Sequence, residues 1–216
     1  MTRKPERALV AGAAGDIEVA VDHPAVFPAE GGEEEAARGI ALVAHPHPLF
    51  GGTLDNKVAQ TLAKTFTELG YVALRPNFRG VGASGGSHDH GVGETDDLVR
   101  VIDWAHGRFG PLPVALAGFS FGAYVQTRVA KRVTPQRMVL VGVPDGMVTG
   151  GRVYKTEPVP PDTIVIHGEL DETAPLANAV AWARPQELPV VVVPGADHFF
   201  HRKLHLIKSI VKGQWR

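Results

Sequence analysis

The chain has 216 residues, of which 44% are hydrophobic, and its formal net charge is −1. This length and balance predict one globular domain over residues 1–216 and exclude the basic face that nucleic-acid binding requires. The sequence contains no cysteine, which excludes disulfides, a thiolate nucleophile and cysteine metal ligands.

No apolar run reaches the roughly 18 residues of a membrane span, and the apolar stretch 8–14 is a poor signal peptide. The chain also lacks a polybasic run that would draw it to an acidic membrane surface. We therefore expect a cytoplasmic protein, a monomer or a homodimer, that has no membrane partner and no nucleic-acid partner.

The first elements predicted along the chain are a hairpin and a loop. Residues 7–23 alternate apolar and polar side chains around Gly15-Asp16, which predicts a β-hairpin. Residues 28–38 include the glutamate run 33–35 and are expected to form a solvated loop.

From residue 40 to the end, buried strands alternate with amphipathic helices. The predicted strands cover residues 40–44, 71–74, 113–117, 137–143, 163–166 and 189–193. The predicted helices cover residues 54–69, 94–106, 121–132, 176–183 and 200–211. This alternation predicts an α/β fold with a mostly parallel sheet and helices on both faces. Ligands of such sheets bind at the carboxyl ends of the strands, so catalytic residues are expected just after them.

A Gly-x-Ser-x-Gly motif, Gly118 to Gly122, lies between a predicted strand and a predicted helix. The turn it forms is tight, so glycine is needed two residues before and two residues after the serine. The following helix N-terminus favours developing negative charge. Ser120 is therefore the predicted nucleophile, with an ordinary strand-to-helix turn as the alternative interpretation.

A serine hydroxyl needs a neighbouring base, and histidine has a suitable pKa. His198 follows the last predicted strand and is the predicted base, whereas His201 and His205 are expected on the surface of the last helix. The acid that orients this base is expected after the preceding strand. Asp171 is the predicted acid, and Glu169 is its nearest rival.

The loop after the first parallel strand, residues 44–52, is expected to complete an oxyanion hole. Pro46 and Pro48 have no N–H, so the backbone N–H of His47 is the predicted donor and that of Leu49 the fallback. The second predicted donor is the N–H of Phe121, which follows the nucleophile.

Two His-x-His pairs, at residues 45–47 and 88–90, offer an alternative metal-dependent chemistry. Neither pair is followed by the further ligands that zinc hydrolases need. We expect no metal and no cofactor, and an exposed loop at residues 88–90. Arg79 is expected to hydrogen-bond its own loop rather than to bind a substrate carboxylate.

Five segments together resemble the α/β-hydrolase superfamily, and within it small bacterial hydrolases related to dienelactone-hydrolase-like and serine-aminopeptidase-like proteins. They are residues 45–52, 77–84, 118–122, 167–171 and 197–198. The resemblance implies an α/β-hydrolase fold with an eight-stranded sheet whose second strand is antiparallel, and esterase-type chemistry. It carries the catalytic roles over to Ser120, Asp171 and His198, and the oxyanion amides to His47 and Phe121. Glu169 stands where many relatives have aspartate, which keeps it as a rival acid.

Many relatives insert a helical lid at the position of residues 144–162, but this segment is short and rich in glycine and proline. We expect no substantial lid, and therefore an open site for small to medium carboxylic esters, with Phe50, Phe121 and Phe199 as apolar walls. A thioesterase, a lactonase or a small peptidase would use the same residues. A non-catalytic binding protein of the same fold is a further alternative.

Overall fold

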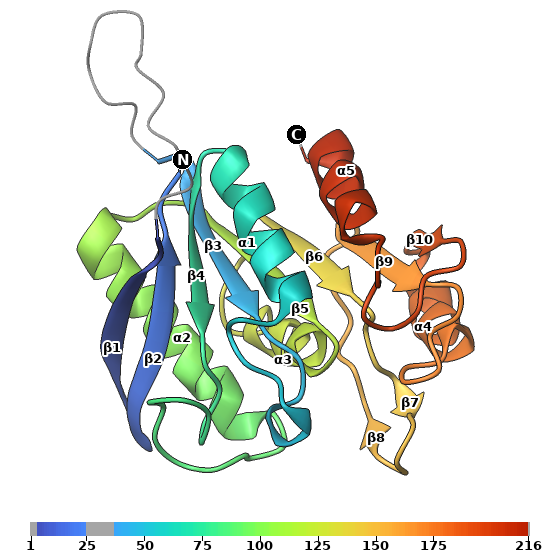
Figure 1. The fold of residues 1–216 in the computed structure, drawn as a ribbon, viewed down its shortest axis with the longest axis horizontal. Coiled ribbons are helices and arrows are strands. Elements are labelled where there is room, and N and C mark those ends of the chain that lie inside the picture. The colour runs from blue at the N-terminus through green and yellow to red at the C-terminus, as the bar shows by residue number, and fades with distance from the viewer. Residues whose placement is uncertain (1–3, 25–36, 216) are drawn as a thin grey trace, which may run out of the picture.

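One eight-stranded sheet forms the centre of the protein (Figure 1). The structure is a computed structural model that describes residues 4–24 and 37–215, so most of the predicted loop 28–38 lies outside the described residues. The strands run in the spatial order β1-β2-β4-β3-β5-β6-β9-β10. Their bounds are β1 Glu6–Gly12, β2 Gly15–Asp22, β3 Gly39–Ala44, β4 Tyr71–Pro76, β5 Val114–Phe119, β6 Arg137–Val141, β9 Ile164–Gly168 and β10 Val190–Val193.

The second strand is the one that reverses direction. β2 pairs antiparallel with β1 and with β4. The other described pairs of the sheet, from β4 to β10, are parallel. The predicted hairpin and the α/β-hydrolase fold with an antiparallel second strand are thus confirmed.

Helices cover both faces of the sheet (Figure 1). Their bounds are α1 Lys57–Glu68, α2 Val92–Phe109, α3 Phe121–Val129, α4 Leu176–Ala183 and α5 Leu204–Gln214. Helices α1 and α5 share one hydrophobic core with the sheet, and α2, α3 and α4 share the other. Strand β3 serves both cores because successive side chains point to opposite faces: Leu42 packs in one core and Val43 in the other.

Two helices begin later than the sequence pattern predicts, for local reasons. Helix α1 starts at Lys57 rather than at residue 54, because the Asn56 side chain accepts hydrogen bonds from the N–H groups of Val58 and Ala59 and caps the helix there. Helix α5 starts at Leu204 rather than at residue 200. The residues Phe200 and Arg202 have φ angles of 54° and 62°, which no right-handed helix accommodates.

No helix lies between β6 and β9 in the described part of the chain. Instead, β7 (Gly146–Met147) and β8 (Val153–Tyr154) pair as a short antiparallel hairpin. The expected absence of a substantial lid therefore holds, but the sequence pattern indicated only loop where this hairpin forms. Figure 1 shows the hairpin projecting from the carboxyl-end edge of the sheet.

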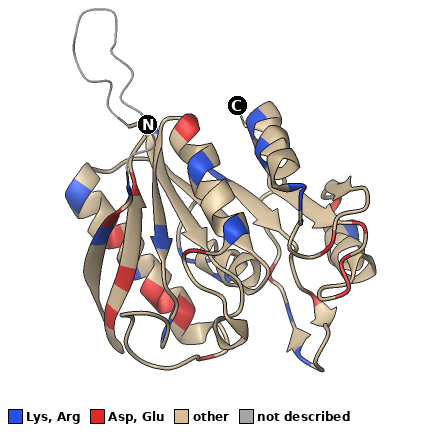
Figure 2. Cartoon of the chain, viewed as in Figure 1, with Lys and Arg blue, Asp and Glu red and all other residues tan. Residues whose placement is uncertain are grey.

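Acidic and basic residues are interspersed over the helices and edge strands seen in Figure 2, and they gather into no single basic face in that view. Within residues 4–24 and 37–215, no helix combines the length and the apolar character that crossing a bilayer demands.

Candidate active site

Ser120 lies in a sharp turn between β5 and α3. Its φ and ψ angles are 55° and −122°, a strained combination for a residue with a side chain. A Cβ on Gly118 would lie 2.5 Å from the Gly122 carbonyl oxygen, and a Cβ on Gly122 would lie 2.4 Å from that of Ala44. Both glycines of the motif are therefore required by close backbone approach. The Ser120 N–H donates to the Val141 oxygen at 2.9 Å, which ties the turn to β6.

The structure brings Ser120, His198 and Asp171 together in one hydrogen-bonded chain. His198 Nε2 lies 2.9 Å from Ser120 Oγ, and His198 Nδ1 lies 2.7 Å from Asp171 Oδ2. The Asp171 side chain is fully buried and that of His198 is 5% exposed. With Nδ1–H donating to the carboxylate, Nε2 is left as the acceptor for the serine proton.

The Asp171 carboxylate is held in place by the backbone that follows it. Its Oδ1 atom accepts hydrogen bonds from the N–H groups of Thr173 and Ala174, at 3.0 and 2.8 Å. Two such bonds fix the orientation of the carboxylate. Oδ2 is thereby directed to His198.

The rival carboxylates have other partners. Glu169 Oε2 accepts the Gly195 N–H at 2.7 Å, in an exposed position. Asp197 accepts the N–H of His201 at 3.1 Å and contacts its ring, so it caps its own loop. The His201 side chain is 73% exposed, which places it on the surface as predicted.

His167 is a buried neighbour of this arrangement whose role the sequence did not reveal. Its Nε2 atom bonds to the Ala174 oxygen at 2.8 Å and lies 3.4 Å from Asp171 Oδ2. Burial lowers the pKa of His167, so the ring is neutral and Nε2 carries the proton that it donates. His167 thus holds the acid-bearing loop against the end of β9.

The loop after β3 presents the His47 N–H beside the serine turn. Three other N–H groups of this loop bond within it: Leu49 N–H bonds to His47 Nδ1, and those of Phe50 and Gly52 bond to the His47 oxygen. The N–H of Leu49, the alternative oxyanion donor, is therefore already bonded to the His47 ring. The His47 N–H makes no such bond to a described residue, and that of Phe121 is in the first helical turn, where no intrahelical acceptor exists.

His45 is a structural residue that anchors this loop. Its Nδ1 bonds to the Pro46 oxygen at 2.7 Å, and its Nε2 accepts the Phe78 N–H at 2.9 Å. Burial lowers the pKa of His45 to about 4, so the ring is neutral. Because both ring nitrogens have backbone partners, the His45–His47 pair does not form a metal site.

Residues 88–90 form the exposed loop that the sequence predicted at Asp89 and His90, but not at His88. The His88 side chain is only 7% exposed, and its Nδ1 lies 2.9 Å from Glu94 Oε1. The His88 ring packs between those of His47 and His90, at 4.7 and 4.9 Å between ring centroids. Among the described residues, no three His, Asp or Glu side chains come together as metal ligands.

Arg79 makes structural hydrogen bonds, as predicted, but its partner lies on a helix rather than in its own loop. Its guanidinium donates to both carboxylate oxygens of Asp97, at 2.6 and 3.1 Å. The bidentate pair fixes the loop after β4 to α2 and leaves no free fork for a substrate.

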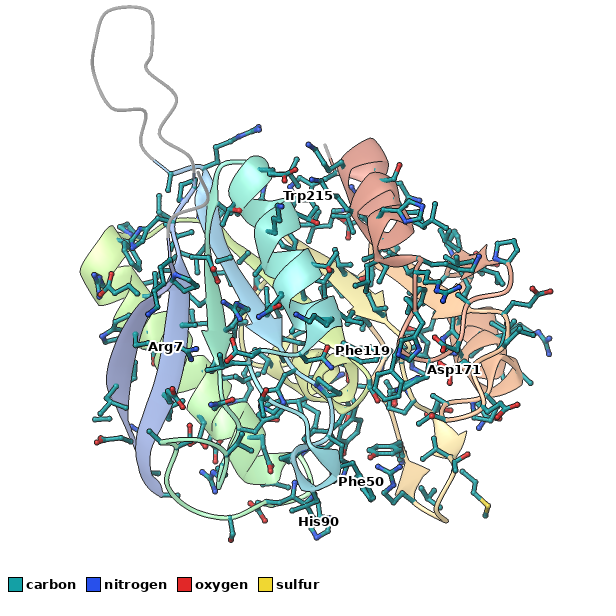
Figure 3. The ribbon with its side chains drawn as sticks, in the orientation of Figure 1. Arg7, Phe50, His90, Phe119, Asp171 and Trp215 are labelled. Carbon is teal, nitrogen blue, oxygen red and sulfur yellow. The ribbon has the colours of Figure 1, made fainter. Side chains whose placement is uncertain are left out.

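A cavity of about 320 Å³ opens beside the serine turn. Phe121 lines it together with polar side chains from α3, from the β7–β8 hairpin and from two loops, namely Tyr124, Arg152, Tyr154, His47, His88 and His90. Figure 3 shows Phe50 and His90 near one another at the carboxyl-end edge of the sheet. Of the three phenylalanines predicted as apolar walls, only Phe121 lines the cavity. Phe50 is 68% exposed and packs against Arg152 and His47 at its edge, whereas Phe199 is 45% exposed and packs against Phe119 and His198. No sequence pattern pointed to Arg152, Tyr124 or Tyr154 as residues of the site, because only the fold brings them to the cavity.

The sheet topology, the serine turn and the hydrogen-bonded chain define the class of the protein, an α/β serine hydrolase. The family model of X-Pro dipeptidyl-peptidase (S15 family) matches residues 23–146, more than half of the chain. The chain belongs to this family within the α/β-hydrolase superfamily.

Two solved structures from bacteria are similar over nearly the whole chain. An α/β serine hydrolase without lid from Xanthomonas campestris is 34% identical, with a TM-score of 0.84, and covers 99% of this chain and 94% of its own. An α/β serine hydrolase homologue from Coxiella burnetii is 33% identical, with a TM-score of 0.81 and 99% of both chains covered.

Two sequence relatives extend the comparison. An uncharacterized protein of Rickettsia prowazekii is 33% identical over 76% of this chain and 73% of its own length. A lysophosphatidylserine lipase of Xenopus tropicalis is 26% identical over 86% of this chain. The match spans only 43% of the lipase.

Proposed function

We propose that the protein hydrolyses small to medium carboxylic esters through an acyl-enzyme on Ser120. The observation that carries the proposal is the hydrogen-bonded chain from Ser120 Oγ to His198 Nε2, 2.9 Å, and from His198 Nδ1 to Asp171 Oδ2, 2.7 Å. His198 is thus within hydrogen-bonding distance of both the nucleophile and the acid that orients it.

The mechanism follows from these contacts. Ser120 Oγ attacks the ester carbonyl carbon while His198 Nε2 takes its proton, and Asp171 stabilises the imidazolium. The oxyanion accepts hydrogen bonds from the N–H groups of His47 and Phe121. His198 then protonates the departing alcohol, which leaves the acyl group on Ser120. Water attacks the acyl-enzyme, gives its proton to His198, and releases the acid and the free serine.

The surroundings of the serine favour a small ester. The cavity of about 320 Å³ is at the lower end of the roughly 300–1,000 Å³ common for small-molecule sites. The described residues between β6 and β9 contribute the short β7–β8 hairpin to its lining but no lid helix that would enclose a long acyl chain.

A peptidase that recognises a free N-terminus needs a carboxylate to bind its ammonium group. None of the residues that line the cavity is an aspartate or glutamate, whereas Arg152 and three histidines line it. This lining disfavours a positively charged substrate end and supports an ester over an N-terminal dipeptide as the substrate. The lipase name of the Xenopus tropicalis relative also belongs to ester chemistry.

Labelling with a fluorophosphonate tests the nucleophile. Such a probe phosphonylates an activated serine, so we expect stoichiometric label on Ser120 and none on the Ser120→Ala variant. A series of p-nitrophenyl esters of increasing acyl length, with matched thioesters and amides, measures kcat/KM for each class. Absent labelling together with an active Ser120→Ala variant would sink the proposal. A higher kcat/KM for thioesters or amides would replace the ester assignment.

A further inference from the structure

The cavity beside Ser120 is lined by hydrogen-bond donors. Arg152 and Tyr154 come from the β7–β8 hairpin, Tyr124 from α3, and His47 and His90 from two other loops. No aspartate or glutamate is among the lining residues of this described region. A donor-rich cavity without a carboxylate is complementary to an anionic group.

The Arg152 guanidinium is fixed above the cavity with unused donors. Its carbon lies 4.3 Å from the centre of the Phe50 ring, so the two side chains bridge from the hairpin to the loop after β3. A guanidinium has five N–H donors. Arg152 makes two hydrogen bonds to described residues, to the Thr149 oxygen at 3.0 Å and to the Tyr154 hydroxyl at 3.5 Å. Its Nε is enclosed and bonded to no described atom.

Two tyrosine hydroxyls add further donors. The Tyr154 oxygen accepts from Arg152, and the Tyr124 oxygen accepts from Arg128 at 3.4 Å. Each hydroxyl therefore keeps its own O–H free to donate. The two tyrosine rings lie 5.1 Å apart, and both residues line the cavity.

The side chains that line the cavity are complementary to a ligand with a single negative charge. Burial, and the electrostatic influence of the neighbouring His88, Arg152 and His90 side chains, lower the pKa of His47 to about 4. The His47 ring is therefore neutral at neutral pH, and Arg152 is the permanent cation among the lining residues. One guanidinium fork can hold one carboxylate through two parallel N–H donors, and its single positive charge balances that one negative charge.

We propose that this cavity, the Arg152 pocket, binds a carboxylate carried by the ester substrate, with Arg152 as its main partner and the hydroxyls of Tyr124 and Tyr154 beside it. The inference rests on the proposed ester hydrolysis at Ser120 and names its substrate class: monoanionic carboxy-esters. Because Phe121 and His47 line the same pocket and supply the proposed oxyanion amides, the bound carboxylate positions the scissile carbonyl next to Ser120.

Matched ester pairs test the pocket. On the acyl side, the p-nitrophenyl monoester of glutaric acid is compared with p-nitrophenyl pentanoate. On the alcohol side, 4-acetoxybenzoate is compared with 4-methylphenyl acetate. Within each pair, we divide kcat/KM for the ester that carries a carboxylate by kcat/KM for the neutral ester. This ratio removes the contribution of the chemical step that both esters share. We expect Arg152→Gln to lower this ratio by about tenfold or more in at least one pair, the loss of a charged hydrogen bond.

Two matched variants separate recognition from general damage. Arg152→Lys keeps the charge and should restore part of the ratio, and Arg100→Gln removes an exposed arginine outside the pocket and should leave the ratio unchanged. Unchanged ratios for both pairs in Arg152→Gln would overturn the proposal while leaving ester hydrolysis intact.

Binding without turnover tests the pocket separately from catalysis. Monomethyl glutarate is titrated into the Ser120→Ala variant and followed by ligand-detected NMR. We expect saturable binding that weakens by about tenfold when Arg152→Gln is added. Equal binding by both variants would contradict the pocket, and it would do so even if the protein hydrolysed no ester and failed to label at Ser120.

Discussion

Glu169 and Asp171 lie two residues apart on the loop after β9, yet their carboxylates bind different partners. Glu169 Oε2 accepts the exposed Gly195 N–H at 2.7 Å, and Asp171 Oδ2 lies 2.7 Å from His198 Nδ1. The distances are equal, so the environments distinguish the two groups. The Asp171 side chain is fully buried with two backbone donors on its other oxygen.

The first prediction separates these two acids. Asp171→Asn would present the wrong hydrogen-bonding pattern to His198, and we expect kcat to fall by about 10⁴-fold. Glu169→Gln, its matched control, loses only a bond to a surface loop and should retain turnover near the wild-type value. Steady-state kinetics on a p-nitrophenyl ester measures both variants. The reverse order of effects would make Glu169 the catalytic acid.

The second prediction isolates the His47 N–H. The φ angle of His47 is −56°, which proline also adopts, so His47→Pro removes the N–H with a compatible φ. We expect kcat to fall by about 100-fold or more. His47→Ala removes the same imidazole but keeps the N–H, and it should retain most of the turnover. Equal loss in the two variants would assign the effect to the ring, and circular dichroism checks that both fold.

The third prediction concerns the serine turn. Gly122→Ala would place a Cβ 2.4 Å from the Ala44 oxygen, and we expect the free energy of unfolding to fall by about 1–3 kcal/mol or more, with Ser120 labelling lost. Gly107 is a contrasting glycine inside α2, where an added Cβ would meet no neighbouring side chain or loop within 4 Å. Gly107→Ala should stabilise the protein by about 1 kcal/mol. Urea titration compares the two, and a neutral Gly122→Ala would refute the backbone clash.

The fourth prediction is a loss of stability in mild acid. His45 protonates near pH 4 in the folded protein and near its ordinary pKa of 6.5 when unfolded, so the unfolded state binds more protons between these values. The stabilisation is present above pH 6.5 and is lost as the pH falls toward 4. From pH 7 to pH 5, His45 alone should lower the free energy of unfolding by about 2 kcal/mol.

His45→Gln provides the comparison for this pH dependence. Glutamine does not titrate, and its amide can replace both backbone hydrogen bonds of the ring. The difference in unfolding free energy between pH 7 and pH 5, from urea titrations, should be smaller in His45→Gln by about the same 2 kcal/mol. Equal pH dependence in the two proteins would mean that His45 titrates normally in the folded state.

Much of the fold follows from patterns within single segments. The buried run at residues 40–44 predicts β3, and the Gly-x-Ser-x-Gly spacing predicts the turn, since close backbone contact at Gly118 and Gly122 admits only glycine. Residues 176–183 predict α4 with its observed bounds. These signals are local, and hydrophobic periodicity captures them.

The remaining features depend on contacts between distant segments. Arg152 and Phe50 are about a hundred residues apart in sequence and pack at 4.3 Å, and no local pattern relates them. His88 looked exposed from its polar neighbours, but tertiary packing against His47 and Glu94 buries it. The start of α5 also differs, because positive φ angles at Phe200 and Arg202 override the apolar periodicity.

Besides the packing of Arg152 on Phe50 and of Tyr154 on Tyr124, a few polar contacts attach the β7–β8 hairpin to the body of the protein. Asn178 donates to the Met147 oxygen at 2.8 Å, and the Thr149 N–H donates to the Thr173 oxygen at 3.0 Å. Met147 and Val153 are 67% and 70% exposed, so they contribute little to either core. A different sequence grafted at residues 146–154 would therefore alter which substrates fit the cavity, while Ser120, His198 and Asp171, which lie on other elements, would stay in place.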